Sequence, residues 1–478
     1  MKVLFAASEA VPFAKTGGLA DVSGSLPKYL NKLGADIRVV IPKYRSIPVQ
    51  YLDKAEPLAS FIVNVGWRHQ PCNVLRVEHE GVLFYLLENS YYFDRDGLYG
   101  HYDQAEQFTF FSRAVLELLP QIGFKPDIIH CNDWQTGVVS LLLSAQYKSK
   151  DYFSYIKTIF TIHNLKYQGV FPKETLNDLL GLGWEYFTVE KVEFYDQVNF
   201  MKAGLVYSDV ITTVSKTYAN EIKYDFFGEN LSDVIRRRSN DLYGIINGID
   251  FEANDPATDS RLFANYDSEN INGKYINKSM LQESLGLPVD KDIPVIGIIS
   301  RLVDHKGFDL IACVLDEILS ENIQLVVLGS GDYAFEEMFR HASARYPQKV
   351  SCNIKYDATL AQRIFAGSDM LLMPSLFEPC GLTQLFGLRY GAIPIVRETG
   401  GLKDTIQSYN EFNGEGNGFS FANYNAHDML YTIRRAIAFY HNPDIWSMLV
   451  RRAMKLDYSW DKSAREYLKL YENLCKRL

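Results

Sequence analysis

The chain lacks any apolar run approaching the roughly 20 residues that a membrane span requires. It starts with Met1-Lys2 and the apolar residues 3–7, which have the charge and hydrophobicity that begin a secretory signal. Ser8 and Glu9 end this run after five residues, short of the about 7–15 apolar residues that a signal peptide contains. We therefore expect neither a membrane anchor nor a cleaved leader.

Cysteine is scarce and scattered. The six cysteines form no Cys-x-x-Cys pair and no spacing typical of metal ligands; they stand at positions 72, 131, 313, 352, 380 and 475. Disulfides are characteristic of oxidising compartments, so this usage favours a reduced, intracellular protein. We expect a cytoplasmic protein without a structural metal site.

Basic segments are missing as well. The formal net charge is −9, and no strongly basic stretch offsets it. Binding of nucleic acid depends on lysine and arginine that neutralise phosphates, so this charge argues against a general nucleic-acid binder. Neither a P-loop nor a Gly-x-Ser-x-Gly nucleophile elbow accompanies the polar residues that follow the predicted strands.

Short apolar runs recur along the chain with helical stretches between them. In the first half they are residues 3–7, 37–41, 127–130, 158–162, 210–214 and 244–246, and in the second half 294–299, 324–328, 369–373 and 393–396. Continuous rather than alternating apolar runs are typical of parallel strands covered on both faces. The closer-spaced runs within residues 61–95 predict an antiparallel extension.

The length of 478 residues exceeds the about 250–300 at which one core usually divides. A polar stretch over residues 254–277 interrupts the succession of strand-like and helical segments. We place the domain boundary at the start of this stretch. The prediction is an α/β protein with two Rossmann-like domains that face a cleft. Ligands of such sheets bind beyond the carboxyl ends of strands.

The first strand is followed by a turn that contains Lys15, Gly17 and Gly18. A helix is predicted next, because apolar residues repeat at spacings of three and four: Leu19, Val22, Leu26, Leu30 and Leu33. Helix amino termini present free amides and partial positive charge, which favours phosphate. The alternative is an ordinary turn with an exposed lysine.

A second cationic turn follows the run at 294–299. Arg301 and Lys306 lie five residues apart, and Gly307 comes next. Arginine binds two phosphate oxygens at once and lysine adds a point charge, so this pair suits a diphosphate. The alternative is a pair of ordinary surface cations.

The run at 369–373 leads into a loop that contains Glu378 between Pro379 and Phe377. Residues 381–384 are expected to open a helix, whose amides and Thr383 hydroxyl would form a second anion site. A carboxylate next to phosphate is unfavourable unless it binds something else, and sugar hydroxyls are the natural partner. Glu378 is therefore predicted to bind a sugar.

In the first half, polar residues end two further strands. Asp133 follows one run and His163 follows another, and Asn247 closes the last strand of this half. A lone histidine at a strand end is often purely structural, so both interpretations stay open. Asp94-Arg95-Asp96 has the Asp-x-Asp form of metal-dependent glycosyltransferases, but it lies in a tyrosine-rich loop and we interpret it as coincidental.

With these residues assembled, the chain resembles the retaining glycosyltransferases of the starch synthase and bacterial glycogen synthase family, which have the GT-B fold. The resemblance runs from Met1 to the C-terminus. Its most specific parts are residues 15–21, 93–95, 97–100, 163–164, 247–250, Arg301, 306–307 and 378–384.

The resemblance implies transfer of glucose from ADP-glucose to the non-reducing end of an α-1,4-glucan such as glycogen, with retention and without metal or other cofactor. It implies a first domain of residues 1–250 on the acceptor side and a nucleotide-sugar-binding domain of residues 251–455. Residues 456–478 are expected to form a helix that packs back on the first domain. Closure of the two domains is expected to exclude water.

The family's roles carry over to matching positions. Arg301 and Lys306 are expected to neutralise the distal phosphate as the glycosidic bond breaks. Lys15 and Gly18 are expected to approach the same diphosphate from the first domain. His163 is expected to contact the sugar near the reacting carbon.

The remaining roles concern the two ends of the donor. Thr383 and the amides near Gly381 and Leu382 are expected to complete phosphate binding, and Glu378 to hold the glucose hydroxyls. Asp133 and Asn247 are expected to line the donor pocket, and Tyr356 to stack on the base. The second position of the wider Glu-x7-Glu motif is Phe386, so only the first carboxylate's role carries over.

Three alternatives remain open. UDP-glucose could be the donor, since the sequence does not decide the base. A glucan phosphorylase would share fold and substrate but require pyridoxal phosphate, and its cofactor lysine motif is not apparent here. A glucan-binding protein on a decayed scaffold is disfavoured by the intact Lys15, Arg301, Lys306 and Glu378. The oligomeric state stays open.

Overall fold

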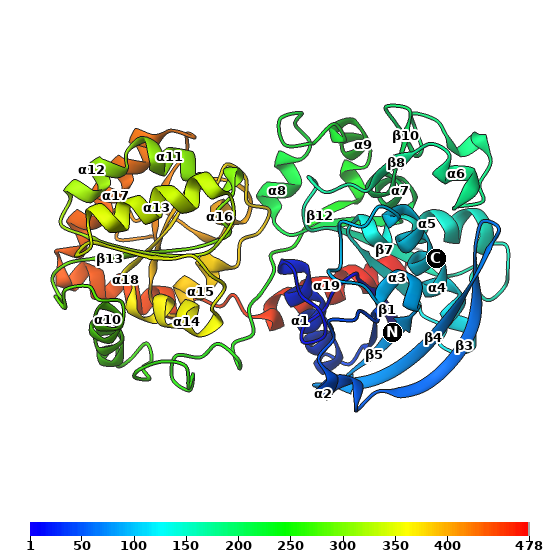
Figure 1. Ribbon diagram of the computed structural model, residues 1–478, viewed down its shortest axis with the longest axis horizontal. Helices are drawn as coiled ribbons and strands as arrows, with labels where there is room; N and C mark the ends of the chain where they lie inside the picture. The colour runs from blue at the N-terminus through cyan, green and yellow to red at the C-terminus, as the bar shows by residue number, and fades with distance from the viewer. Residues whose placement is uncertain (477–478) are drawn as a thin grey trace. The chain divides into compact units, whose positions relative to one another are not determined.

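The computed structural model describes residues 1–476, which form two compact units (Figure 1). Unit 1 comprises Met1–Asn247 together with the described residues from Trp460 onward, and unit 2 comprises Gly248–Ser459. Among residues 1–476, no helix has both the length and the apolar character needed to span a bilayer.

Unit 1 is built on a nine-stranded sheet with the strand order β12-β11-β7-β6-β1-β2-β5-β4-β3. The strands are β1 (Lys2–Ala6), β2 (Asp36–Pro42), β3 (Glu56–Val65), β4 (Arg68–His79), β5 (Val82–Glu88), β6 (Ile128–Asn132), β7 (Lys157–Ile162), β11 (Val210–Thr213) and β12 (Leu242–Gly244). The pairing from β12 to β5 is parallel, and β3 and β4 continue the sheet in antiparallel pairing.

The predicted parallel sheet and its antiparallel extension are therefore confirmed, with two corrections. The strand expected at 244–246 lies two residues earlier, because β12 pairs through Leu242–Gly244 with β11. The strand expected at 127–130 continues to Asn132, which pairs with Thr161 of β7. Polar residues there stay in the sheet because their backbone hydrogen bonds are satisfied by neighbouring strands.

Helices cover this sheet, and a small sheet of β8 (Val170–Pro172), β9 (Glu193–Phe194) and β10 (Gln197–Asn199) accompanies it. The helices are α1 (Gly18–Lys32), α2 (Val49–Leu52), α3 (Ser90–Phe93), α4 (Gln104–Gln121), α5 (Gly137–Leu142), α6 (Thr175–Asp178), α7 (Phe200–Tyr207), α8 (Lys216–Glu221), α9 (Ser232–Arg237) and α19 (Trp460–Cys475). The C-terminal α19 packs beside α1 (Figure 1).

Helix α1 shows why the sequence folds this way locally. Its residues Leu19, Val22, Leu26 and Leu30 are buried, which the spacing of three and four predicted. Its first turn carries an acidic residue and its last turn a basic one, and both charges are favourable to the helix dipole. The buried face packs on a sheet whose central strand β1 is fully buried from residue 3 to 6.

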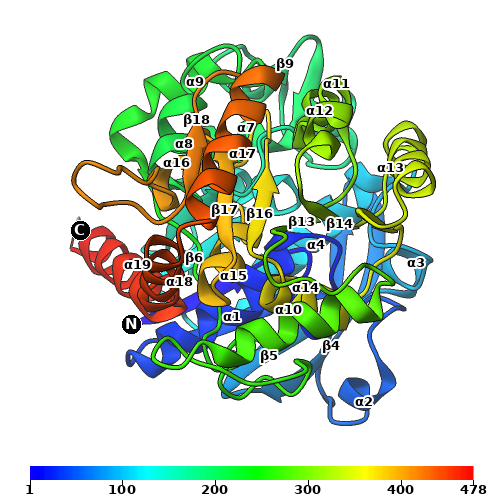
Figure 2. The ribbon, with the colours of Figure 1, turned by 90° about the vertical axis from the view of Figure 1, so that its left-hand side faces the viewer.

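Unit 2 has a six-stranded parallel sheet with the order β15-β14-β13-β16-β17-β18 (Figure 2). The strands are β13 (Val295–Ile299), β14 (Gln324–Leu328), β15 (Val350–Asn353), β16 (Met370–Met373), β17 (Ile393–Arg397) and β18 (Phe419–Phe421). The helices are α10 (Asn272–Ser284), α11 (Phe308–Cys313), α12 (Leu315–Ser320), α13 (Tyr333–Arg345), α14 (Ala358–Gly367), α15 (Thr383–Arg389), α16 (Gly400–Thr405), α17 (Ala426–Tyr440) and α18 (Pro443–Lys455).

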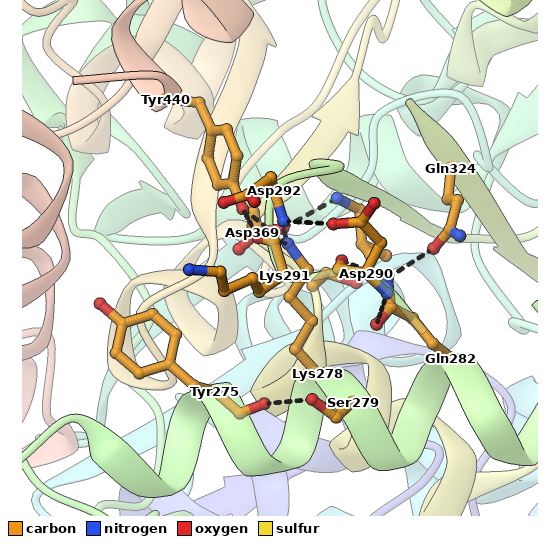
Figure 3. A network of polar contacts seen from close by, with 12 residues as sticks. Tyr275, Lys278, Ser279, Gln282, Asp290, Lys291, Asp292, Gln324, Asp369 and Tyr440 are labelled. Atoms are coloured by element: carbon orange, nitrogen blue, oxygen red, sulfur yellow. Dashed lines mark hydrogen bonds and ion pairs between the residues drawn. The ribbon is translucent and has the colours of Figure 1, made fainter. Parts of the chain in front are cut away.

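A buried polar network fastens α10 to the core of unit 2 (Figure 3). Lys278 Nζ lies 2.8 Å from Asp369 Oδ2, and it donates to Tyr440 Oη at 2.6 Å. The same carboxylate oxygen accepts from the backbone N–H of Val295 at 2.8 Å. Because both charges are paired and hydrogen-bonded, their burial is tolerated, and the start of β13 is held to the start of β16.

Candidate active site

In unit 1, adjacent parallel strands bring the predicted residues to one edge of the sheet. Strands β1, β6 and β7 are neighbours, and all three point the same way. Lys15 follows β1, Asp133 follows β6, and His163 follows β7. Their shared edge is the carboxyl edge, where ligands of such sheets bind.

The turn before α1 is organised by a carboxylate that the sequence did not single out. Buried Glu9 accepts hydrogen bonds from the backbone N–H of Thr16, from its hydroxyl at 2.8 Å, and from the N–H of Gly17. Burial raises the pKa of this carboxyl above its usual value. The amides of Thr16 and Gly17 are therefore already engaged by an internal carboxylate.

Residues 15–18 of this turn are all exposed, and Lys15 and Gly18 flank the two amides that Glu9 engages. A side chain at Gly18 would meet no atom within 4 Å, so its backbone faces open space. Lys15 Nζ contacts both carboxylate oxygens of Asp21, at 2.6 and 2.8 Å. Such an exposed pair contributes about 0–1 kcal/mol, so a phosphate can replace Asp21 at little cost.

Asp133 adopts a positive φ of 55°, which is unusual for a residue with a side chain. Its Oδ1 accepts the backbone N–H of His163 at 2.7 Å, and Asn164 donates a second backbone hydrogen bond. Burial raises the pKa of Asp133 to about 7 even though these donors lower it. The carboxylate thus joins the end of β6 to the loop that carries His163.

His163 is partly buried, and burial lowers its pKa to about 3, so the ring is neutral at physiological pH. Its Nε2 lies 2.9 Å from Oδ1 of Asn132. Asn132 was not predicted as a site residue, since its place at a strand end is its only signal in the sequence. Asn247, the last residue of the first segment of unit 1, is buried. Its side-chain oxygen accepts no hydrogen bond from residues 1–476.

In unit 2, the central strands β13 and β16 bring the second group of predicted residues together. Arg301 follows β13 and is exposed, and its guanidinium has no ionic partner among the described residues. Lys306 Nζ lies 2.6 Å from Glu378 Oε2, which follows β16. The hydroxyl of Ser375 donates to the same oxygen at 3.0 Å.

The position of Lys306 depends on Gly307, which has a φ of 78°. A Cβ atom at Gly307 would lie 2.1 Å from the carbonyl oxygen of Pro374. Only glycine permits both this backbone conformation and this close approach. The turn after β13 is therefore packed directly on the loop after β16, and this contact places Lys306 next to Glu378.

The loop after Glu378 reaches the start of α15 at Thr383. Gly381 has a φ of 71°. The side-chain amide of Gln384 donates through Nε2 to the backbone carbonyls of Cys380 and Gly381, at 3.0 and 2.9 Å. Phe386 packs against Phe365 with ring centroids 5.5 Å apart. The second position of the Glu-x7-Glu motif is thus part of the apolar packing.

Tyr356 follows β15 and is 84% exposed. It lies two strands from β13, so within unit 2 it is apart from the group formed by Arg301, Lys306 and Glu378. The paired carboxylates Asp94 and Asp96 both bind Arg45, at 2.8 and 3.3 Å. Within residues 1–476, no cluster of three or more His, Cys, Asp or Glu residues is arranged to hold a metal ion.

Two α/β units, each with a largely parallel sheet covered by helices, are typical of glycosyltransferases with the GT-B fold. Residues 2–237 match the family described as "Starch synthase catalytic domain", and residues 283–446 match "Glycosyl transferases group 1". The chain belongs to the starch synthase and glycogen synthase family.

Relatives and solved structures agree with this assignment. The chain is 56% identical over 475 residues to glycogen synthase of Clostridium novyi, with 99% of each protein covered. It is 54% identical over 477 residues to glycogen synthase of Geobacillus thermodenitrificans, with 100% of this chain and 98% of that protein covered. The catalytic domain of starch synthase IV from Arabidopsis thaliana, solved bound to ADP and acarbose, superposes with a TM-score of 0.92 at 34% identity over 99% of each chain.

The predicted family and fold class are therefore confirmed, and the chain is a glucosyltransferase of the glycogen synthase type. This family assignment disfavours the phosphorylase and the non-enzymatic alternatives.

Proposed function

We propose that the chain transfers glucose from ADP-glucose to the non-reducing end of an α-1,4-glucan such as glycogen, with retention and without a metal ion. The observation that carries this proposal is the group at the ends of the neighbouring strands β13 and β16, where Lys306 is paired with Glu378 and Arg301 follows β13. A diphosphate with an attached sugar presents the matching pair of features, anionic oxygens and hydroxyl groups.

The leaving group determines the role of the cations. As the bond between glucose C1 and the phosphate oxygen breaks, negative charge develops on the distal phosphate. Arg301 and Lys306 stabilise this charge, so their effect is larger in the transition state than in the bound donor. Lys15 and Gly18 are unit 1's proposed contribution to binding of the same diphosphate, and Gly381, Leu382 and Thr383 extend unit 2's contribution.

The sugar is proposed to be recognised by four residues. Glu378 accepts hydrogen bonds from glucose hydroxyls, and its Ser375 contact keeps the carboxylate in place. His163, Asp133 and Asn247 form the unit 1 contribution to donor binding, and the unpaired, buried oxygen of Asn247 has a free acceptor site for a hydroxyl. Tyr356 is proposed to stack on the base, to which its exposed ring is accessible.

The starch synthase IV structure was solved with ADP and acarbose, which supports an adenine nucleotide and a glucan as partners of this chain too. All six cysteines are free thiols in the structure. That state is favoured in the reducing cytoplasm, where we propose that the enzyme works.

The decisive experiment supplies purified enzyme with glycogen and either ADP-glucose or UDP-glucose, and measures release of ADP and UDP. We expect ADP release to exceed UDP release by at least tenfold, with the added glucose removable by an enzyme specific for α-1,4 linkages. Preference for UDP-glucose would replace the proposed donor, and no transfer from either donor would overturn the proposed reaction. Activity should persist in EDTA.

A further inference from the structure

The side chain of Asn132, the last residue of β6, is completely buried. Its Nδ2 donates to the carbonyl oxygens of Ala6 at 3.0 Å and His130 at 3.3 Å. In the reversed orientation, Oδ1 would face these two oxygens without any hydrogen between them. The hydrogen-bond network therefore determines which end of the amide is oxygen.

This orientation determines where His163 carries its proton. Asn132 Oδ1, 2.9 Å from His163 Nε2, can only accept a hydrogen bond. Nε2 must therefore bear the hydrogen, and in the neutral ring Nδ1 is left with its lone pair. No residue among 1–476 is hydrogen-bonded to Nδ1, so this nitrogen is available to a ligand.

We propose that Asn132 is a positioning residue that holds His163 as the Nε2–H tautomer, so that Nδ1 serves only as an acceptor for a hydroxyl of the donor glucose. The inference rests on the proposed function, in which His163 contacts the donor sugar. It adds a selectivity rule to that function. A hydroxyl at the contacted carbon can donate to Nδ1, whereas a carboxylate there would place two acceptors face to face.

Asn31 offers a matched control in the same unit. Its Nδ2 also donates to two carbonyl oxygens, those of Ile37 at 3.3 Å and Gly81 at 3.2 Å, and its Oδ1 accepts one N–H at 2.7 Å. It lies next to the start of β2, at the amino edge of the parallel strands. Asn31→Leu removes an equivalent set of hydrogen bonds without touching His163.

The first test reads the tautomer directly in the free enzyme. ¹⁵N-histidine NMR, with the His163 signal assigned by its loss in His163→Gln, should show a protonated Nε2 and an unprotonated Nδ1. Asn132→Leu should shift the ring toward the Nδ1–H tautomer, because its Nε2 then faces an apolar group. Asn132→Asp should retain Nε2–H, because the buried aspartic acid in its protonated form can donate its hydroxyl hydrogen to a backbone carbonyl and still accept from Nε2 with its other oxygen. An Nδ1–H signal in the unmodified enzyme would overturn the inference, whether or not Asn132→Leu folds.

The second test uses monodeoxy analogues of ADP-glucose. We expect Asn132→Leu to lower kcat/KM for ADP-glucose roughly 10- to 100-fold, the range for losing a hydrogen bond and leaving a group unpaired. Asn132→Asp should recover most of this loss, and Asn31→Leu should lower only thermal stability. For the analogue that lacks the contacted hydroxyl, the effect of Asn132→Leu should largely disappear.

The outcomes separate the two proposals. An equal loss with every analogue would assign Asn132 a purely structural role and overturn the inference, while leaving glucose transfer intact. Failure of the unmodified enzyme to use ADP-glucose would overturn the proposed donor, and the NMR result would still decide the tautomer.

Discussion

Lys306 and Glu378, 72 residues apart in the chain, form an ion pair of 2.6 Å in unit 2. The two side chains were expected to serve different parts of the donor, the phosphate and the sugar. Because they share a hydrogen bond, the carboxylate also holds the lysine where the phosphate is proposed to bind. The hydroxyl of Ser375 donates to the same carboxylate oxygen at 3.0 Å, so Glu378 has a second contact that does not involve the lysine.

Replacement of Glu378 by glutamine should separate the two roles. Glu378→Gln removes the negative charge next to Lys306, so ADP should bind at least as tightly as to the unmodified enzyme. Turnover should fall by at least tenfold, because the sugar loses its charged acceptor. Calorimetry with ADP and an assay of glucose transfer measure the two effects. Loss of ADP binding would instead place Glu378 at the nucleotide.

Removal of the Lys306 charge should affect the chemical step. Lys306→Ala should reduce kcat by about 10²–10³, the range for losing one donor to developing charge. Lys455, whose exposed ammonium lies 2.7 Å from Glu269 on the surface of unit 2, provides the control. Lys455→Ala should retain full activity, and an equal kcat for the two variants would contradict the proposed role of Lys306.

Gly307 should tolerate no side chain. Gly307→Ala combines a φ of 78° with a Cβ only 2.1 Å from a carbonyl oxygen, so it should destabilise unit 2 by more than the about 1–3 kcal/mol of backbone strain and displace Lys306. Gly286 has a φ of 70° but open space around its Cβ position, so Gly286→Ala carries only the strain. Thermal unfolding and kcat of both variants test this, and similar losses in the two would refute the steric argument.

Buried His130 should make the fold sensitive to acid. Its ring lies between Tyr471 Oη and Thr161 Oγ1, both at 2.6 Å, and burial lowers its pKa to about 3 from 6.5. Because the folded pKa is depressed, the unfolded chain binds a proton first as pH falls below 6.5. The stabilisation from neutral His130 is complete above that pH and is lost progressively toward pH 3.

A comparison of the unmodified enzyme with His130→Gln isolates this effect. Between pH 6.5 and 4.5, the unmodified enzyme should lose about 2 kcal/mol more unfolding free energy than the variant, at about 1.4 kcal/mol per pH unit. Urea unfolding at the two pH values measures the difference. Parallel losses in both proteins would show that His130 takes up its proton without unfolding.

Much of the fold could be predicted because apolar runs are local signals. Buried parallel strands need continuous apolar residues, and β1, β7, β13 and β14 lie within a residue or so of the expected ranges. Two short strands with polar residues, β15 and β18, were not predicted. They have only four and three residues, and they derive their stability from neighbours far away in the chain.

The residue types of the candidate site, and their places after strands, could likewise be predicted from the sequence. Motifs predicted Lys15, His163, Arg301, Lys306 and Glu378 as candidates, because each follows a predicted strand of a parallel sheet, where ligands bind. The sequence by itself determined the family, the two α/β sheets and the inventory of polar side chains.

Only the tertiary structure decided how those side chains pair. The orientation of Asn132 toward His163 and the ion pair between Lys306 and Glu378 both depend on neighbouring strands. A hydrogen bond requires a donor and an acceptor within about 3 Å in the right direction, and that geometry arises only when separate strands meet at one edge of a sheet.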